Sequence, residues 1–145
     1  MPERETIERA QEDAQEGKSP STQAGEFVRE EMHHIREGKH GAASTKQAIA
    51  IGLSKARRSG VKLPAKGSAS TRRKAQQDTA ASRSKRKPSA KRSRATLTAL
   101  KREPRSAASR SALSRQAKTT AKKRSASARS QSARKAANTR SRKAA

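Results

Sequence analysis

Apolar residues in the first 65 positions recur every three or four residues, which is the spacing of one face of an α-helix. Three segments show this pattern and are predicted as helices: residues 6–16, 21–37 and 45–59. The stripe of the second segment consists of Ala24, Val28, Met32 and Ile35, with Phe27 beside them. The first part of the chain is therefore expected to form a small helical head.

Polar and small residues mark the ends of these helices. Ser44 followed by Gln47 forms a capping-box pattern at the start of the third segment. Gly60 is the expected stop, and Pro64 prevents continuation. The six-residue link Gly38–Ala43, which precedes the Ser44 cap, suits an antiparallel helical hairpin. Gly52 lies on the apolar side of its helix, which predicts a close approach to a neighbouring helix.

The apolar pattern stops after Ala65. Residues 66–145 contain only three large apolar residues, whereas 26 Lys or Arg, 19 Ala and 15 Ser make up 60 of the 80 positions. Repulsion between like charges and the many serines favour disorder. The predicted fold class is mostly α: a helical head of two to three short helices (residues 1–65) and a long, largely disordered cationic tail (residues 66–145).

The charge is concentrated in this tail. The chain has 37 Lys and Arg against 12 Asp and Glu, a net charge of +25. The head has a net charge of +1 and the tail +24. Such a cation favours a polyanionic partner. Its binding energy would come from the release of counterions from phosphates, which needs no fixed geometry and gives little sequence preference.

The predicted function is therefore sequence-nonspecific binding and compaction of DNA, as in a histone-like, nucleoid-associated protein. The residues expected to contact phosphate are Lys55, Arg57, Arg58, Lys62, Arg72, Arg73, Lys74, Lys85, Arg86, Lys87, Lys91, Arg92, Arg94, Lys101, Arg102, Lys122, Lys123, Arg124, Arg134, Lys135, Arg140, Arg142 and Lys143. Two alternatives stay open. One is an RNA- or ribosome-associated accessory protein, and the other is a protein-interaction module in the head, with the tail used for localisation.

Other classes of function find little support in the sequence. The chain has no cysteine and no evident pairing of a nucleophile with a base, so we expect no enzyme and no cofactor. It shows no leader and no long apolar run, which predicts a cytoplasmic protein without a membrane partner. A homodimer through the small head is one predicted assembly.

The head also resembles known sequences. The stretches GEFVREEMHHIREGKHG (residues 25–41) and STKQAIAIGLSKARRSGVKLP (residues 44–64) are similar to segments of short, uncharacterised bacterial basic proteins. Some of those proteins are labelled DNA-binding or plasmid-stabilisation proteins. The resemblance covers roughly residues 1–65 and implies no catalytic residues. The tail is similar in composition to linker-histone and bacterial histone-like tails.

Three further features have competing interpretations. The only candidate metal cluster is His33, His34, Glu37 and His40, which we interpret as solvated surface side chains with no metal. The second and third segments could also form a helix-turn-helix, in which Lys46, Gln47, Ser54 and Lys55 would face DNA bases. The acidic residues of segment 6–16 and of the few residues before it are interpreted as ordinary surface charge. The alternative is that they compete with nucleic acid for the tail.

Overall fold

The computed structural model describes residues 2–84 and 89–144, with side chains to residue 142. The chain divides into two compact units, Met1–Ser109 and Arg110–Ala145. The first unit begins with three helices, α1 (Arg4–Gln15), α2 (Pro20–Arg36) and α3 (Thr45–Arg58). All three predicted helices of the head are present, with ends within two residues of those expected.

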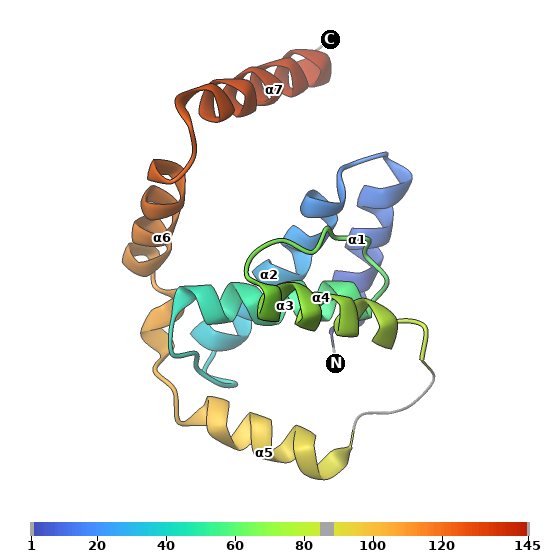
Figure 1. Ribbon diagram of the computed structural model, residues 1–145, viewed down its shortest axis with the longest axis vertical. Coiled ribbons are helices and arrows are strands. Elements are labelled where there is room, and N and C mark those ends of the chain that lie inside the picture. Colours follow the sequence, from blue (N-terminus) through green and yellow to red (C-terminus); the bar gives the residue numbers. More distant parts are fainter. Residues whose placement is uncertain (1, 85–88, 145) are drawn as a thin grey trace. The chain divides into compact units, whose positions relative to one another are not determined.

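The tail is not disordered, and this part of the predicted fold class is wrong. It contains α4 (Ala69–Ala81), α5 (Ala90–Lys101), the short 3₁₀ turn η1 (Arg105–Ala108), α6 (Arg110–Lys122) and α7 (Ala126–Ala144), as Figure 1 shows. Helices therefore cover most of the described chain. The same helices show that the description of the protein as intrinsically disordered is wrong.

The serines of the tail explain much of this order. Each of its four α-helices begins directly after a serine, at Ser68, Ser89, Ser109 and Ser125. The Ser68 hydroxyl accepts a hydrogen bond from the Thr71 N–H at 3.3 Å, and the Ser125 hydroxyl accepts one from Ala128 at 3.2 Å. Serine at such a cap stabilises a helix, whereas serine inside one weakens it. Ala, Arg and Lys between the caps are good helix formers.

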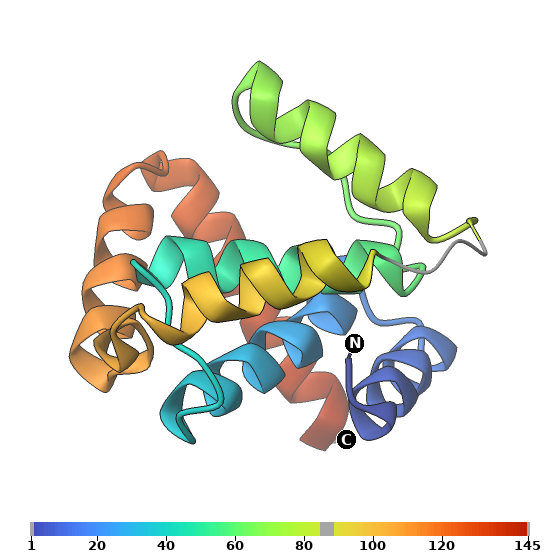
Figure 2. The same cartoon turned by 90° about the horizontal axis from the view of Figure 1, so that it is seen from below.

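The core of the first unit lies between α1, α2 and α3, which Figures 1 and 2 show packed together. Phe27 and Ile35 are fully buried there, and partly buried Leu53 packs beside Phe27. The tail adds buried residues of its own, which are Ala75 on α4 and Ala107 and Ala108 on η1. A small apolar set thus becomes a sufficient core partly because residues from the tail cover it.

Gly52 is the point of closest approach between α2 and α3. A Cβ atom added there would lie 2.8 Å from the Val28 Cα and 3.0 Å from the Val28 nitrogen. The predicted close approach of this glycine to a neighbouring helix is confirmed. One half of the predicted capping box is present, since the Gln47 N–H donates to the Ser44 hydroxyl at 3.2 Å, whereas the Gln47 side chain accepts from the N–H of Ala43, one residue before the cap, at 2.7 Å.

Residues 100–108, which we call the return segment, bring the tail back to the head. The N–H groups of Gly41 and Ala42 donate to the carbonyls of Leu100 and Pro104 at 2.9 and 3.1 Å. The Thr45 hydroxyl donates to the Ala107 carbonyl at 2.7 Å. The tail therefore contributes to the loop between α2 and α3.

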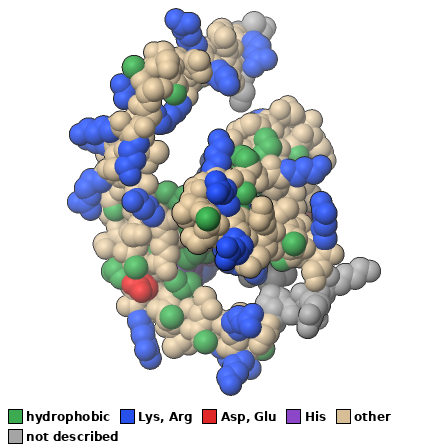
Figure 3. All heavy atoms as spheres, viewed as in Figure 1, with side chains coloured by type: hydrophobic (Ala, Val, Ile, Leu, Met, Phe, Trp, Pro, Cys, Tyr) green, Lys and Arg blue, Asp and Glu red, His purple; other side chains and the backbone are tan. Residues whose placement is uncertain are grey.

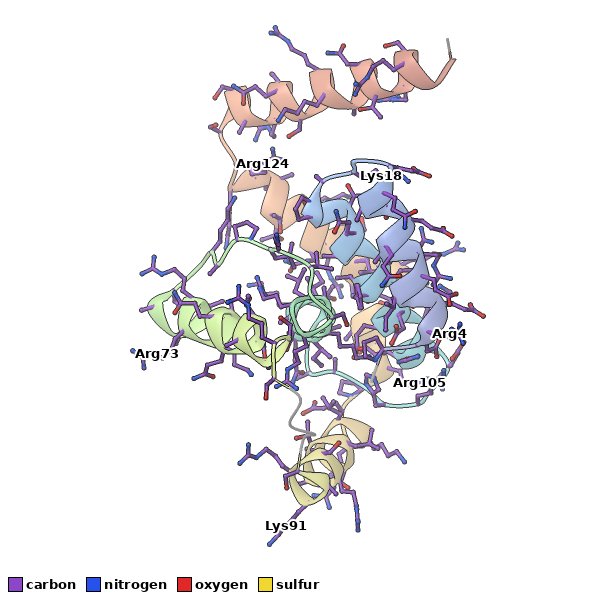
Figure 4. The ribbon with its side chains drawn as sticks, turned by 90° about the vertical axis from the view of Figure 1, so that its right-hand side faces the viewer. Arg4, Lys18, Arg73, Lys91, Arg105 and Arg124 are labelled. Carbon is purple, nitrogen blue, oxygen red and sulfur yellow. The ribbon has the colours of Figure 1, made fainter. Side chains whose placement is uncertain are left out.

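Two arginines complete the contact between the return segment and α2. Arg105 donates to the carbonyls of Ile35 and Arg36 at the end of α2 (Figure 4). Arg36 in turn donates to the Ala108 carbonyl at 2.9 Å. The division after Ser109 differs from the predicted boundary after Ala65, and independent folding of residues 1–65 stays a prediction.

Candidate nucleic-acid interface

The second unit carries positive charge alone. Residues 110–145 include twelve Lys and Arg and no Asp or Glu. All eleven of these cations whose side chains are described are exposed, and Figure 3 shows Lys and Arg side chains projecting along α6 and α7. Seven of them are among the phosphate contacts that the sequence predicted: Lys122, Lys123, Arg124, Arg134, Lys135, Arg140 and Arg142. The side chain of Lys143, which was also predicted, lies outside the described residues.

The helices give part of this charge a fixed arrangement. Arg115, Lys118 and Lys122 follow one another on α6 at intervals of three and four residues, so they share one face of the helix. Leu113 and Gln116 lie on the opposite side and are partly buried. Sequence reasoning missed Arg115 and Lys118, because it treated the segment as a flexible polycation without faces.

The helices α4 and α5 add further exposed cations in the first unit. These are Arg72 and Arg73 on α4, and Lys91, Arg92, Arg94 and Lys101 on α5, followed by Arg102. Figure 4 shows Arg73 and Lys91 directed away from the helices that carry them. Lys62 is likewise exposed after α3. The predicted contacts Lys85, Arg86 and Lys87 lie outside the described residues.

Four of the predicted phosphate contacts in the first unit have partners inside the protein. The Lys55 ammonium lies 2.7 Å from Glu31 and 3.2 Å from Glu30. Arg58 and Lys74 both pair with Asp78, and Arg57 donates to the Pro64 carbonyl at 3.4 Å. The structure assigns these four side chains to holding the fold, so they are not included in the interface.

Asp78 fastens α4 to α3. Its carboxylate is only 2% exposed and accepts hydrogen bonds from Ser54 at 2.7 Å, Lys74 at 2.9 Å and Arg58 at 3.1 Å. Burial by itself would raise the pKa of Asp78, but the hydrogen bonds from Lys74, Ser54 and Arg58 outweigh it and hold the pKa below its ordinary value. The ionised carboxylate is therefore the form that stabilises the folded chain.

Replacing Asp78 with asparagine should loosen α4 and lower the free energy of unfolding at neutral pH by about 1–2 kcal/mol, the scale of charge-assisted hydrogen bonds with exposed partners. The folded-state pKa is lowered, so this stabilisation is full above the ordinary pKa of about 4 and disappears as the pH falls through the lower folded value. Urea unfolding at pH 7 and about pH 2.5 measures the difference. Gln77→Ala, at an exposed position of α4, is the control, and an unchanged urea midpoint for Asp78→Asn at pH 7 would contradict the assignment.

Most of the side chains that a helix-turn-helix would direct at bases have partners inside the protein. Ser54 donates to Asp78, Lys55 pairs with Glu30 and Glu31, and Gln47 serves the cap of α3. Lys46 is the only one of the four base-directed side chains that is exposed without such a partner among the described residues. A helix with one free side chain has little means of distinguishing bases.

The acidic residues of α1 pair mostly with cations of the first unit. Glu8 lies 2.8 Å from Arg4, and Lys18 lies 2.6 Å from Asp13 and 2.7 Å from Glu16. These pairs support the interpretation of this face as ordinary surface charge. The cations of α6 and α7 are thus left without a carboxylate in their own unit.

The histidines predicted to be solvated are in part buried. His33 is exposed, but the side chains of His34 and His40 are 12% and 9% exposed. His40 Nε2 lies 3.1 Å from the fully buried Glu31, and His34 Nε2 lies 2.9 Å from Glu3. Hydrogen bonds from His34 and Lys39 hold the pKa of Glu3 below its ordinary value, so this carboxylate is ionised at neutral pH. The solvated interpretation is wrong for His34 and His40.

Comparison with known proteins identifies one family. Residues 18–67 match a family of unknown function, DUF6496. No curated protein and no solved structure matches the chain. The matched stretch contains α2 and α3 and the loop between them, which include the buried histidines and Lys55. None of the helices within the described residues is long and apolar enough to cross a membrane.

Proposed function

We propose that this protein binds nucleic acid, with duplex DNA as its main ligand, through cationic faces of its C-terminal helices and without sequence preference. The observation that supports this most strongly is the second unit, which has twelve cations and no Asp or Glu, and in which all eleven cations whose side chains are described are exposed. Such a surface repels itself in the free protein. A phosphate backbone relieves that repulsion and releases its own condensed counterions.

The first unit supports the same proposal through the distribution of its charges. Its buried carboxylates, Glu30, Glu31 and Asp78, are paired with Lys55, Arg58 and Lys74. The exposed cations of α4 and α5 remain to extend the contact surface. Because a DNA duplex has phosphates on every side, a protein with cations on several separate helices can bridge neighbouring duplexes. We therefore include DNA compaction in the proposal, with the nucleoid of a bacterial cell as the expected location.

The proposal is tested by the salt dependence of binding. The full chain is titrated against two labelled duplexes of equal length and unrelated sequence, and against an RNA hairpin of matched length, by fluorescence anisotropy. Binding that neutralises six or more phosphates should weaken by about a thousand-fold or more between roughly 50 and 200 mM salt. The two duplexes should give the same affinity at each salt concentration, because phosphate contacts carry no sequence information.

Three results would contradict this proposal. A shallow salt dependence would show that few of the exposed cations contact phosphate. A strong preference for one duplex would show base recognition, which the arrangement of α3 does not favour. Tighter binding of the RNA hairpin than of both duplexes at equal salt would replace DNA by RNA as the main ligand.

A further inference from the structure

The loop between α2 and α3 brings two histidines to one buried glutamate. Glu31 lies on α2 with no exposed area, His34 lies one turn further along the same helix, and His40 reaches back from the loop. One oxygen of Glu31 and one nitrogen from each histidine lie within 4.8 Å of one another. None of these three side chains takes part in the proposed nucleic-acid interface.

Each imidazole has its outer nitrogen already occupied. His34 Nε2 lies 2.9 Å from the Glu3 carboxylate, and His40 Nδ1 lies 3.0 Å from the Gly41 carbonyl. A carbonyl and an ionised carboxylate can only accept, so both nitrogens carry a proton. In the neutral imidazole the other nitrogen, His34 Nδ1 or His40 Nε2, then has a free lone pair. Metal-binding histidines are oriented in this way by a carboxylate or a backbone carbonyl.

The free nitrogens face carboxylate oxygens. His40 Nε2 lies 3.1 Å from Glu31 Oε1, and His34 Nδ1 lies 3.9 Å from Glu30 Oε1. A lone pair directed at a carboxylate is repulsive unless a cation lies between them. Neither oxygen of Glu31 receives a hydrogen bond of normal geometry from a described residue, although Lys55 and His40 are at ion-pair distance.

The groups around Glu31, His34 and His40 carry a net negative charge when the imidazoles are neutral. The carboxylates joined by these contacts are Glu3, Glu30, Glu31 and Glu37. Only two ammonium groups, those of Lys39 and Lys55, pair with them among the described residues. With neutral imidazoles the four carboxylates and two ammoniums leave two negative charges, which one divalent cation would balance.

We propose that Glu31, His34 and His40 bind a zinc ion. Two imidazole nitrogens and a carboxylate oxygen are the donor set that Zn²⁺ accepts, with a fourth position left for Glu30 or water. Glu31 can serve both partners, because Oε1 faces His40 while Oε2 pairs with Lys55. A cavity of about 320 Å³ borders the site on the side of His34, where Glu3, Glu30 and Lys39 also line it, whereas Glu31 and His40 are not part of its lining.

Such an ion would join the C-terminal half of α2 to the loop that follows it. That loop also receives the return segment through Gly41 and Ala42. Zinc at this site would therefore fix the part of the head on which the tail docks. Its role is structural, and it contributes to folding stability instead of contacting nucleic acid.

The test uses the full chain without a histidine tag, freed of metal with a chelator, and Co²⁺ as the spectroscopic probe for Zn²⁺. One equivalent of Co²⁺ should bind and give the visible absorption of a low-symmetry site, and added Zn²⁺ should abolish it. His34→Gln and His40→Gln should each weaken Co²⁺ binding by more than about 100-fold. His33→Gln, at the exposed neighbouring histidine, is the matched control and should bind as the natural chain does.

A second variant keeps the test decisive if a ligand variant fails to fold. Glu3→Gln leaves all three ligands in place and replaces the carboxylate that faces His34 and Lys39 by a neutral amide, so Co²⁺ binding should weaken by about 10- to 100-fold. Circular dichroism checks the helix content of each variant. No saturable absorption in the natural chain, or equal binding by His34→Gln, His40→Gln and the natural chain, would overturn the proposal and leave protons and Lys55 as the balancing charges.

Discussion

Replacing Gly41 with alanine should detach the return segment from the head. A Cβ atom at Gly41 would lie 1.9 Å from the Glu103 carbonyl oxygen and 2.8 Å from that of Pro104. Both are backbone atoms, so no side-chain rotation relieves the clash. The segment must move away, and the hydrogen bonds from Gly41 to Leu100 and from Ala42 to Pro104 then break.

The damage extends to neighbouring hydrogen bonds, because Thr45 and Arg36 donate to the carbonyls of Ala107 and Ala108 in the same segment. Overpacking and the breaking of several hydrogen bonds together should lower the free energy of unfolding by about 3 kcal/mol or more. Hydrogen exchange measured by mass spectrometry should show faster exchange in residues 100–108 and at Ala42. Urea unfolding gives the change in stability.

Gly25→Ala is the matched control for this substitution. Gly25 lies within α2, and a Cβ atom there would meet nothing within 4 Å. Because alanine favours a helix over glycine, the control should be neutral or stabilising by up to about 1 kcal/mol. If both substitutions left exchange in residues 100–108 unchanged, the return segment would not be docked in solution as described.

The second large effect is expected on DNA affinity, when three cations on one face of α6 are removed together. The variant is Arg115→Gln, Lys118→Gln and Lys122→Gln. Each cation that no longer neutralises a phosphate lowers the slope of log affinity against log salt by about 0.9, which corresponds to roughly eight-fold in affinity at 0.1 M salt. Removing all three cations from this face should therefore weaken binding by about 500-fold.

The control removes the same charge from positions that do not share a face. Arg134, Lys135 and Arg140 point in three directions spread around α7, so a straight helix can place about one of them on a given phosphate backbone. Changing these three to glutamine should weaken binding by only about eight-fold. Equal effects of the two variants would show that total charge, and not the face of α6, determines affinity.

This contrast tests the expectation from the sequence that binding needs no fixed geometry. That expectation depended on disorder, which the structure contradicts. The sequence held the relevant signals, namely a serine before each helix and long stretches without Gly or Pro. The composition nevertheless predicts disorder, if repulsion between cations is taken to exceed the helix propensity of Ala, Arg and Lys.

The candidate metal site shows a different limit of sequence reasoning. Several acid–histidine pairs on α2 have helical spacing, among them Glu30 with His33 and His33 with Glu37. Glu31 and His34 stand at the same spacing of three residues, and the buried side of α2 selects that pair. The apolar stripe of α2 places Glu31 beside Phe27 and Ile35 and places His33 on the opposite side, but the spacing does not show that His40 and Lys55 come to Glu31.

The sequence by itself determined where the helices of the head begin and end, because caps, glycine stops and apolar spacing act over three or four residues. It also determined the concentration of positive charge, which is the basis of the proposed function. Only the tertiary structure decided which charges stay free. Asp78 meets Ser54 and Arg58, and Glu31 meets Lys55, across helices that are separate in the chain, and His40 reaches Glu31 from the loop after α2. Burying a charge is costly without partners, and those partners come together only when the helices pack.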